Sequence, residues 1–243
     1  GVSIFGRYED VPLADQHKLF RTNFWGVVHG SLIAAEHLKT RGGAIINLGS
    51  ELSDHAIPLQ GMYSASKHAV KGFTDSLRIE LEHARAPVSV TLIKPAALDT
   101  LFIPHAKNYM NVEPKLPPPV YAPDLAADAI LYAAQHPRRD IFVGGAARFN
   151  SVGARLAPRT TDWVLRLMGF ASQRTDQPAG ERHDILHQPG RALRERHGGQ
   201  YVFENSLTTR AELHPKTTFA LAVGALALFA LWRMGRPRLP ASG

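Results

Sequence analysis

The chain has 243 residues, of which 44% are hydrophobic and 20% charged, as is usual for a globular protein with a core of its own. It contains no cysteine, which excludes disulfides, thiolate nucleophiles and cysteine-bound zinc. The net charge of +7 is uneven, because residues 1–150 carry 15 Lys and Arg against 14 Asp and Glu, and residues 151–243 carry 13 against 7. A basic second part can favour anionic surfaces, but no nucleic-acid motif accompanies it, so we expect no nucleic-acid partner.

The first predicted element is a long helix. Apolar residues recur at helical spacing over residues 10–40, and the pair Gly42-Gly43 is a typical helix end. The short apolar run 44–48 follows and predicts a buried strand. Residues 49–62 then have the composition of a loop.

The same order repeats farther along the chain. We expect a helix over 63–84, a strand over 88–93, a proline-rich stretch without regular structure over 94–123, a helix over 124–136 and a strand over 141–143. Alternating helices and strands imply parallel strands joined by right-handed crossovers, hence an α/β fold with a doubly wound sheet of the Rossmann type. Three strands form only the C-terminal half of such a sheet, so we expect an N-terminally truncated chain.

Three stretches of different composition suggest the domain organisation. Residues 1–149 hold the alternating elements and would form the partial Rossmann-type domain. Residues 150–215 form a polar, basic and mainly helical extension, with a helix expected over 161–170. Residues 216–234 form a hydrophobic segment that we predict to be a membrane-associated helix.

The hydrophobic segment contains sixteen uncharged residues, from Thr217 to Trp232. A helix of that length spans about 24 Å, short of the roughly 30 Å hydrocarbon core, but Lys216 and Arg233 can extend it by snorkelling. We therefore predict membrane association through residues 217–232, with a helix that covers the core or an oligomer contact as the alternative. The expected location is the cytoplasmic face of a membrane, or the cytoplasm.

Candidate catalytic and ligand-binding residues follow one another in a defined order along the chain. Asn23 lies within the first helix, and Ser50 follows the first strand. Tyr63 and Lys67 open the second helix, and Pro95 follows the second strand. Ligands of open α/β sheets bind at the carboxyl ends of the strands, which is where the serine and the proline fall.

Tyr63 and Lys67 are four residues apart and therefore share one face of their helix. A phenol has a reference pKa of about 10, and a nearby ammonium is expected to lower that pKa by stabilising the phenolate. The tyrosine could then exchange a proton with a substrate oxygen. The hydroxyl of Ser50 could both donate to and accept from the same oxygen.

The order Asn23, Ser50, Tyr63-Ser64-Ala65-Ser66-Lys67 resembles the short-chain dehydrogenase/reductase family. The resemblance covers about residues 1–145. It implies NAD(P)-dependent oxidoreductase activity with Tyr63 as general acid/base and Ser50 as the group that orients the substrate. It further implies that Lys67 binds the nicotinamide ribose and that Asn23 holds a water in a proton relay.

The segment Pro95-Ala96-Ala97-Leu98-Asp99-Thr100 resembles the family's cofactor-binding segment, with Ala96 in place of the usual glycine. The resemblance implies that Tyr63 and Lys67 contact NADP or NAD together with these four residues: Pro95, Ala96, Leu98 and Thr100. The apolar residues of 101–122 would form a lid over an apolar secondary alcohol or ketone. A homodimer through the two long helices is also expected.

Three other functions remain open. An epimerase or isomerase of the extended branch shares the Tyr-x-x-x-Lys pattern, although the segment from Pro95 to Thr100 speaks against it. The chain could instead be a non-catalytic, membrane-tethered relative that binds only nucleotide, or a structural tether with a vestigial α/β part. His183 and His187 have metal-ligand spacing, but without a third ligand we predict no metal site.

Overall fold

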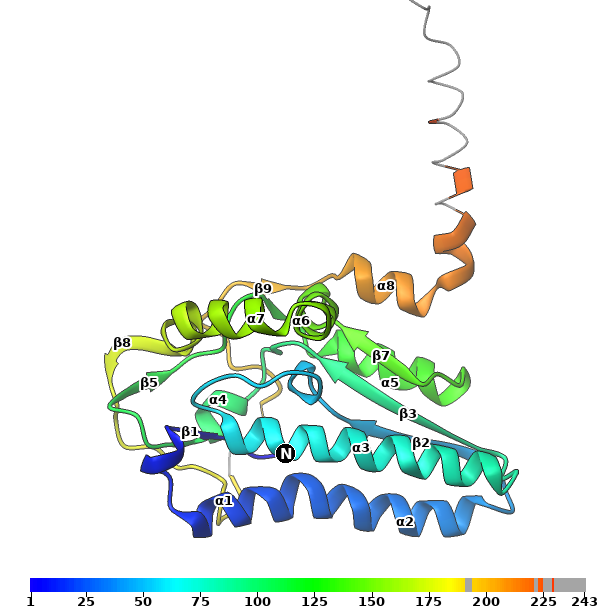
Figure 1. Cartoon of the computed structure of the whole chain (residues 1–243), viewed down its shortest axis with the longest axis horizontal. Helices are drawn as coiled ribbons and strands as arrows, with labels where there is room; N and C mark the ends of the chain where they lie inside the picture. The colour runs from blue at the N-terminus through cyan, green and yellow to red at the C-terminus, as the bar shows by residue number, and fades with distance from the viewer. Residues whose placement is uncertain (191–193, 221–222, 225–228, 230–243) are drawn as a thin grey trace, which may run out of the picture.

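The structure, a computed structural model, describes residues 1–190, 194–220, 223–224 and 229. Its centre is a parallel sheet of three strands in the order β2-β3-β7 (Figure 1). The strands span Gly43–Leu48 (β2), Val88–Pro95 (β3) and Asp140–Val143 (β7). All three lie where the apolar runs of the sequence predict them, and their parallel pairing confirms the α/β fold.

Helices cover both faces of this sheet. On one face α2 (Gly26–Leu38) and α3 (Gly61–His83) pack with Ile45 and Val90. On the other face α5 (Asp124–Gln135) packs with Ile46 and Ile93. Neighbouring strand residues point to opposite faces, so a strand with apolar residues at every position is buried on both sides.

A buried polar bridge fixes the two long helices against the sheet. Ser31 on α2 donates to the side-chain oxygen of Asn47 on β2 at 3.0 Å, and the amide of Asn47 donates to Thr74 on α3 at 3.0 Å. The side chains of Ser31, Asn47 and Thr74 are hydrogen-bonded to one another, so these buried polar groups are paired.

The first predicted helix is interrupted. It consists of α1 (Leu13–Phe20), a π-helical turn (η2, Arg21–Trp25) and α2. The amide of Gly26 donates to the carbonyl of Arg21, five residues back, as in a π turn. Asn23 lies inside this turn, which the regular spacing of the sequence does not reveal.

The prediction of no regular structure over 94–123 is wrong in part. This stretch contains a short helix, α4 (Phe102–His105), and three strands: β4 (Lys107–Asn108), β5 (Val112–Pro114) and β6 (Val120–Tyr121). Each strand pairs with a segment distant in the chain, namely β1 (Ile4–Phe5), β8 (Arg174–Pro178) and β9 (Val202–Phe203). Proline removes one amide donor but leaves the pairing of its neighbours possible at a sheet edge.

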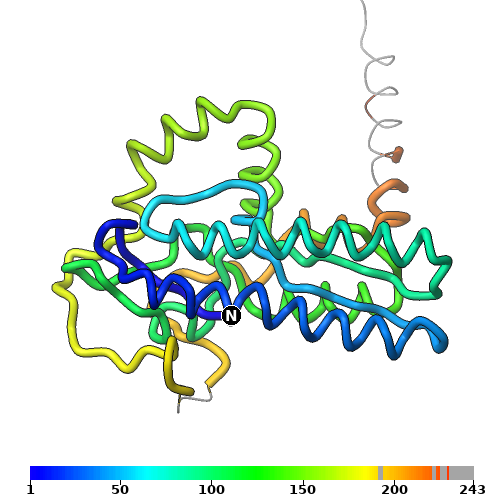
Figure 2. Tube along the Cα trace, turned by 60° about the horizontal axis from the view of Figure 1, so that its bottom comes forward, coloured from blue at the N-terminus to red at the C-terminus, as the bar shows by residue number. Residues whose placement is uncertain are grey.

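Beyond β7 the chain forms helices that the sequence analysis predicts only in part. Gly145 begins α6 (Gly145–Leu156), which was not expected, and α7 (Pro158–Val164) continues into a π turn (η4, Leu165–Gly169) where a helix over 161–170 was predicted. These elements stand out as a yellow-green arch in Figure 2. Short 3-10 turns span Tyr8–Asp10 (η1), Glu51–Ser53 (η3) and Ala171–Gln173 (η5), and the last labelled helix is α8 (Leu207–Leu213).

Most of the predicted hydrophobic helix 216–234 lies outside the described residues. Within the described ranges no helix is both long and apolar enough to cross a membrane. Membrane association through 217–232 therefore stays a prediction.

Candidate active site

A pocket of about 140 Å³ opens at the carboxyl ends of β2 and β3. Four short stretches line it, and they come from the turn after β2, the start of α3, the segment after β3 and the residues between β5 and β6. The lining includes Ser50, Glu51, Ile57, Tyr63, Pro95, Ala96, Leu98, Thr100, Phe102 and Leu116. The structure thus brings together six of the eight residues that the sequence singles out, whereas the side chains of Asn23 and Lys67 are buried outside this lining.

Tyr63 lies in the first turn of α3 and is half-buried. Its ring meets Phe102 edge to face, with the centroids 5.3 Å apart, and its hydroxyl is hydrogen-bonded to Ser50. The hydroxyl of Ser50 also accepts from the amide of Leu52 at 3.1 Å and so caps the 3-10 turn η3. This cap fixes the serine beside the tyrosine.

Lys67 lies one helical turn after Tyr63, with its Nζ 5.6 Å from the centroid of the tyrosine ring. The ammonium donates to the carbonyl of Leu48, the last residue of β2, at 2.9 Å. Burial lowers the pKa of Lys67 to about 8, because a charged amine loses its hydration there.

The expected lowering of the tyrosine pKa is not found. Burial raises the pKa of Tyr63 to about 12; the hydrogen bond with Ser50 lowers it, and the charge of Glu51 raises it further. Loss of hydration therefore outweighs the stabilisation of phenolate. At neutral pH the hydroxyl carries its proton.

Asn23 is buried outside the pocket lining and holds the backbone at the start of the chain. Its side-chain oxygen accepts from the amide of Val2 and its amide donates to the carbonyl of Val2, both at 2.8 Å. The same amide lies 3.3 Å from the hydroxyl of Ser66. The side chain thus has protein partners on both its atoms, and its role in a proton relay stays a prediction.

The segment after β3 is fixed by neighbouring strands. The amide of Ala96 donates to the carbonyl of Val143, the end of β7, at 2.9 Å. The amide of Asp99 donates to Tyr121 on β6 at 2.9 Å, and Leu98 pairs with the same residue. The hydroxyl of Thr100 accepts from the amide of Phe102, the first residue of α4, at 3.3 Å. The backbone around Leu98 is therefore held at the pocket wall.

Glu51 is a site residue that the sequence analysis missed. Its carboxylate accepts from the side-chain amide of Asn150 on α6 at 2.8 Å. Burial raises the pKa of Glu51 to about 7, against the lowering effect of that hydrogen bond. Its place directly after Ser50 was a usable signal, whereas its partner lies 99 residues farther along the chain.

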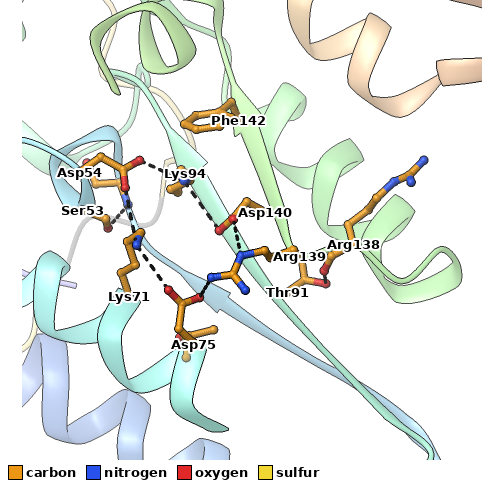
Figure 3. A network of polar contacts seen from close by, with 12 residues as sticks. Ser53, Asp54, Lys71, Asp75, Thr91, Lys94, Arg138, Arg139, Asp140 and Phe142 are labelled. Carbon is orange, nitrogen blue, oxygen red and sulfur yellow. Dashed lines mark hydrogen bonds and ion pairs between the residues drawn. The ribbon is translucent and has the colours of Figure 1, made fainter. Parts of the chain in front are cut away.

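A charged network anchors the strand ends beneath the pocket (Figure 3). Lys94 on β3 is buried, and its Nζ lies 2.9 Å from Asp54 and 3.7 Å from Asp140. The same ammonium sits 4.1 Å from the ring centroid of Phe142. Lys71 on α3 joins the network through Asp54 at 4.0 Å. Buried ion pairs of this kind determine position more than they add stability.

His183 and His187 have metal-ligand spacing, and their surroundings in the structure can be compared with those of a metal site. The Nε2 of His187 lies 2.7 Å from Asp15 on α1. Across the described part of the chain, no group of three His, Asp or Glu side chains is arranged to hold a metal ion. The contact with Asp15 gives His187 a packing partner.

These features define an α/β protein with a tyrosine, lysine and serine site at the carboxyl ends of its parallel strands. The sequence profile of the family described as short chain dehydrogenase matches residues 1–108. This match covers somewhat less than half of the chain.

Individual relatives extend the comparison. YxnA of Bacillus subtilis, described as an uncharacterized oxidoreductase, is 37% identical over 231 residues, which cover 93% of this chain and 65% of YxnA. A short-chain dehydrogenase from Burkholderia cenocepacia, solved in complex with NADP, has a TM-score of 0.57 and 28% identity, and the match covers 68% of this chain and 65% of that one. One from Streptomyces avermitilis, at 21% identity and a TM-score of 0.56, shares the fold and covers 70% of this chain and 68% of its own. The chain thus spans slightly less than two thirds of YxnA and of the Burkholderia protein.

Proposed function

We propose that the protein is an NAD(P)-dependent oxidoreductase that interconverts an alcohol and a carbonyl compound, with Tyr63 as general acid/base. The observation that carries this proposal is the meeting of Ser50, Tyr63 and the segment after Pro95 in one pocket. The family match over residues 1–108 supports it, and so does the oxidoreductase description of YxnA. NADP is the first cofactor to test, because the Burkholderia structure was solved with NADP.

The residues present fit a nicotinamide nucleotide. An ammonium has three donors, and Lys67 directs one to Leu48, so two remain for ribose hydroxyls. The hydroxyl of Thr100 and the backbone around Leu98 line the same pocket. When bound, the nicotinamide would supply or accept hydride.

The side chains of the protein itself would transfer the proton in this reaction. Because the pKa of Tyr63 is raised to about 12, its hydroxyl is protonated at neutral pH and suits donation to a carbonyl oxygen during reduction. Ser50, hydrogen-bonded to Tyr63, would hold that oxygen in line with the donor. In the reverse direction Tyr63 would accept the alcohol proton.

The pocket walls favour an apolar substrate. Nine of its fourteen lining residues are apolar, among them Ile57, Phe102 and Leu116, and mostly apolar walls with a few polar groups are typical of small-molecule sites. Phe102 and Leu116 belong to the stretch that was expected to form a lid. We therefore propose an apolar secondary alcohol or ketone as the substrate class.

Replacement of Tyr63 by Phe tests the acid/base role in the full-length protein. We expect kcat to fall by about 10²-fold or more, because the general acid is lost, while cofactor affinity changes little. Steady-state turnover with NADPH and with NADH, and fluorescence titration of each cofactor, would measure the two quantities. Tyr132→Phe is the matched control, since this tyrosine stacks on His136 away from the pocket. Retained turnover in Tyr63→Phe would refute the assignment.

A further inference from the structure

Residues 145–169 form an arch in the chain trace (Figure 2). Large apolar side chains of this segment are exposed. Phe149 and Leu156 on α6 are 77% and 78% exposed, and Trp163 on α7 and Met168 beyond it are 55% and 65% exposed. Single exposed apolar residues are common on protein surfaces, but a cluster on one element marks an interaction site.

The two faces of α6 differ in exposure and in their contacts. Phe149, Val152 and Leu156 are spaced by three and four residues and form one exposed stripe. On the opposite face Ser151 is buried, and Asn150 donates to Glu51 in the pocket. The inner face therefore belongs to the candidate site, and the outer stripe is free for a partner.

The charge of the arch complements an anionic partner. Arg155, Arg159 and Arg166 are exposed, and none of them has an acidic partner within the described part of the chain. Arg148 is different, because it pairs with Glu212 at 2.7 Å. Asp162 is the single acidic residue of 145–169, so the arch that carries the apolar stripe also carries three exposed guanidiniums without an acidic partner among the described residues.

We propose that the outer face of the arch docks on an anionic phospholipid bilayer. A helix with an apolar stripe bordered by arginines lies in the headgroup region, where acyl chains take the apolar groups and phosphates take the guanidiniums. Trp163 suits the same depth. A second copy of the chain fits less well, because a two-fold contact would bring like charges together.

Docking would also place the pocket near the bilayer. Ile57 lines both the pocket and a neighbouring hollow whose other walls include Leu165 and Phe170, at the foot of the arch. An apolar substrate dissolved in the membrane would then be close to Tyr63. This consequence rests on the proposed function, whereas docking itself does not.

Vesicle sedimentation tests the surface. We expect the chain to bind vesicles of phosphatidylglycerol and phosphatidylcholine more tightly than vesicles of phosphatidylcholine alone. Phe149→Asp combined with Leu156→Asp should weaken partitioning by about tenfold or more, because two anchors are lost. The matched control is Leu131→Asp with Ile79→Asp. These residues lie outside the arch and are also well exposed, at 64% and 61%, so the control should change partitioning less than twofold.

Quenching of tryptophan fluorescence by brominated lipid reports the arch directly and does not depend on any arch variant folding. Trp25→Phe and Trp232→Phe leave Trp163 as the single tryptophan. We expect brominated anionic vesicles to quench it when the protein binds. Bound protein without quenching would overturn the proposal, as would equal partitioning of the arch variant and its control. Lipid-free dimerisation that the arch variant abolishes would also overturn it, in favour of a second copy. Neither readout uses turnover, so loss of activity in Tyr63→Phe and loss of docking are distinguishable.

Discussion

At the residue scale, Glu51 gives the pocket a titratable group near neutral pH. Its carboxyl lies beside Ser50 and Tyr63 in the pocket wall and is held by Asn150. Burial raises its pKa from 4.5 to about 7. The folded protein therefore binds the Glu51 proton more tightly than the unfolded chain does. Between about pH 4.5 and 7 the folded state loses stability as the pH rises.

We predict that Glu51→Gln stabilises the protein above pH 7, because glutamine cannot acquire the buried charge. The gain in free energy of unfolding should be of the order of 2 kcal/mol at pH 8 and should shrink toward zero near pH 4.5. Urea unfolding at several pH values would measure it. Glu36→Gln, at an exposed position on α2, should show no such gain. A gain for Glu51→Gln that does not vary with pH would contradict this account.

At the element scale, the segment after the arch is anchored by one glutamine. Gln173 is fully buried, and its amide donates to the carbonyls of Pro58 and Gly169 at 2.7 and 2.8 Å. Its oxygen accepts from Gln60, the residue before α3, at 2.7 Å. The start of α3 is thereby joined to a part of the chain more than a hundred residues away.

Replacing Gln173 by Leu should lower the free energy of unfolding by about 3 kcal/mol. The substitution removes the hydrogen-bond partner of two groups, the carbonyl of Pro58 and the side-chain amide of Gln60, and each such loss costs about 1–3 kcal/mol. The carbonyl of Gly169 keeps the hydroxyl of Ser172 as a donor at 3.1 Å. Gln177→Leu is the control, because this glutamine is exposed on β8. Denaturant midpoints would give the difference, and equal losses in both variants would show that the amide of Gln173 is not the anchor.

The sequence predicts those elements whose pattern is local and misses those that depend on distant partners. The three sheet strands and the helices α3 and α5 have local apolar patterns, so their positions follow from periodicity. Three short strands of the 94–123 stretch pair with segments near residues 4, 174 and 202, and no local pattern contains that information. Ser50, Tyr63 and Lys67 were found because their spacing is itself the signal. The contact of Glu51 with Asn150 depends on where α6 folds back.

At the scale of the whole molecule, the long helices leave apolar side chains in water. Leu32 and Ile33 on α2 are 50% and 69% exposed, and Trp25 in the preceding π turn is 48% exposed. This face lies away from the sheet, since α2 packs on it through Val28, Ser31 and Ala35. A surface of this kind favours a partner.

We predict a homodimer through this face of the long helices. Sedimentation equilibrium should show about twice the mass of the chain, and Ile33→Asp should return it to one copy, since burying an unpaired carboxylate is costly. Leu131→Asp, on α5, is the control. A single-copy mass for the unaltered protein would refute the predicted dimer.

The π turn at Arg21–Trp25 sets the rotational phase of the first long helix. Twelve residues advance a regular α-helix by about 1200°, so without the turn Ser31 would point about 120° away from Leu19. The wider turn takes up most of that angle, and Leu19 and Ser31 are both buried. Converting the turn to regular α-helix without removing a residue would therefore misdirect the contacts of α2. Removing one residue as well would leave an advance of about 1100°, which keeps Ser31 within about 20° of the direction of Leu19.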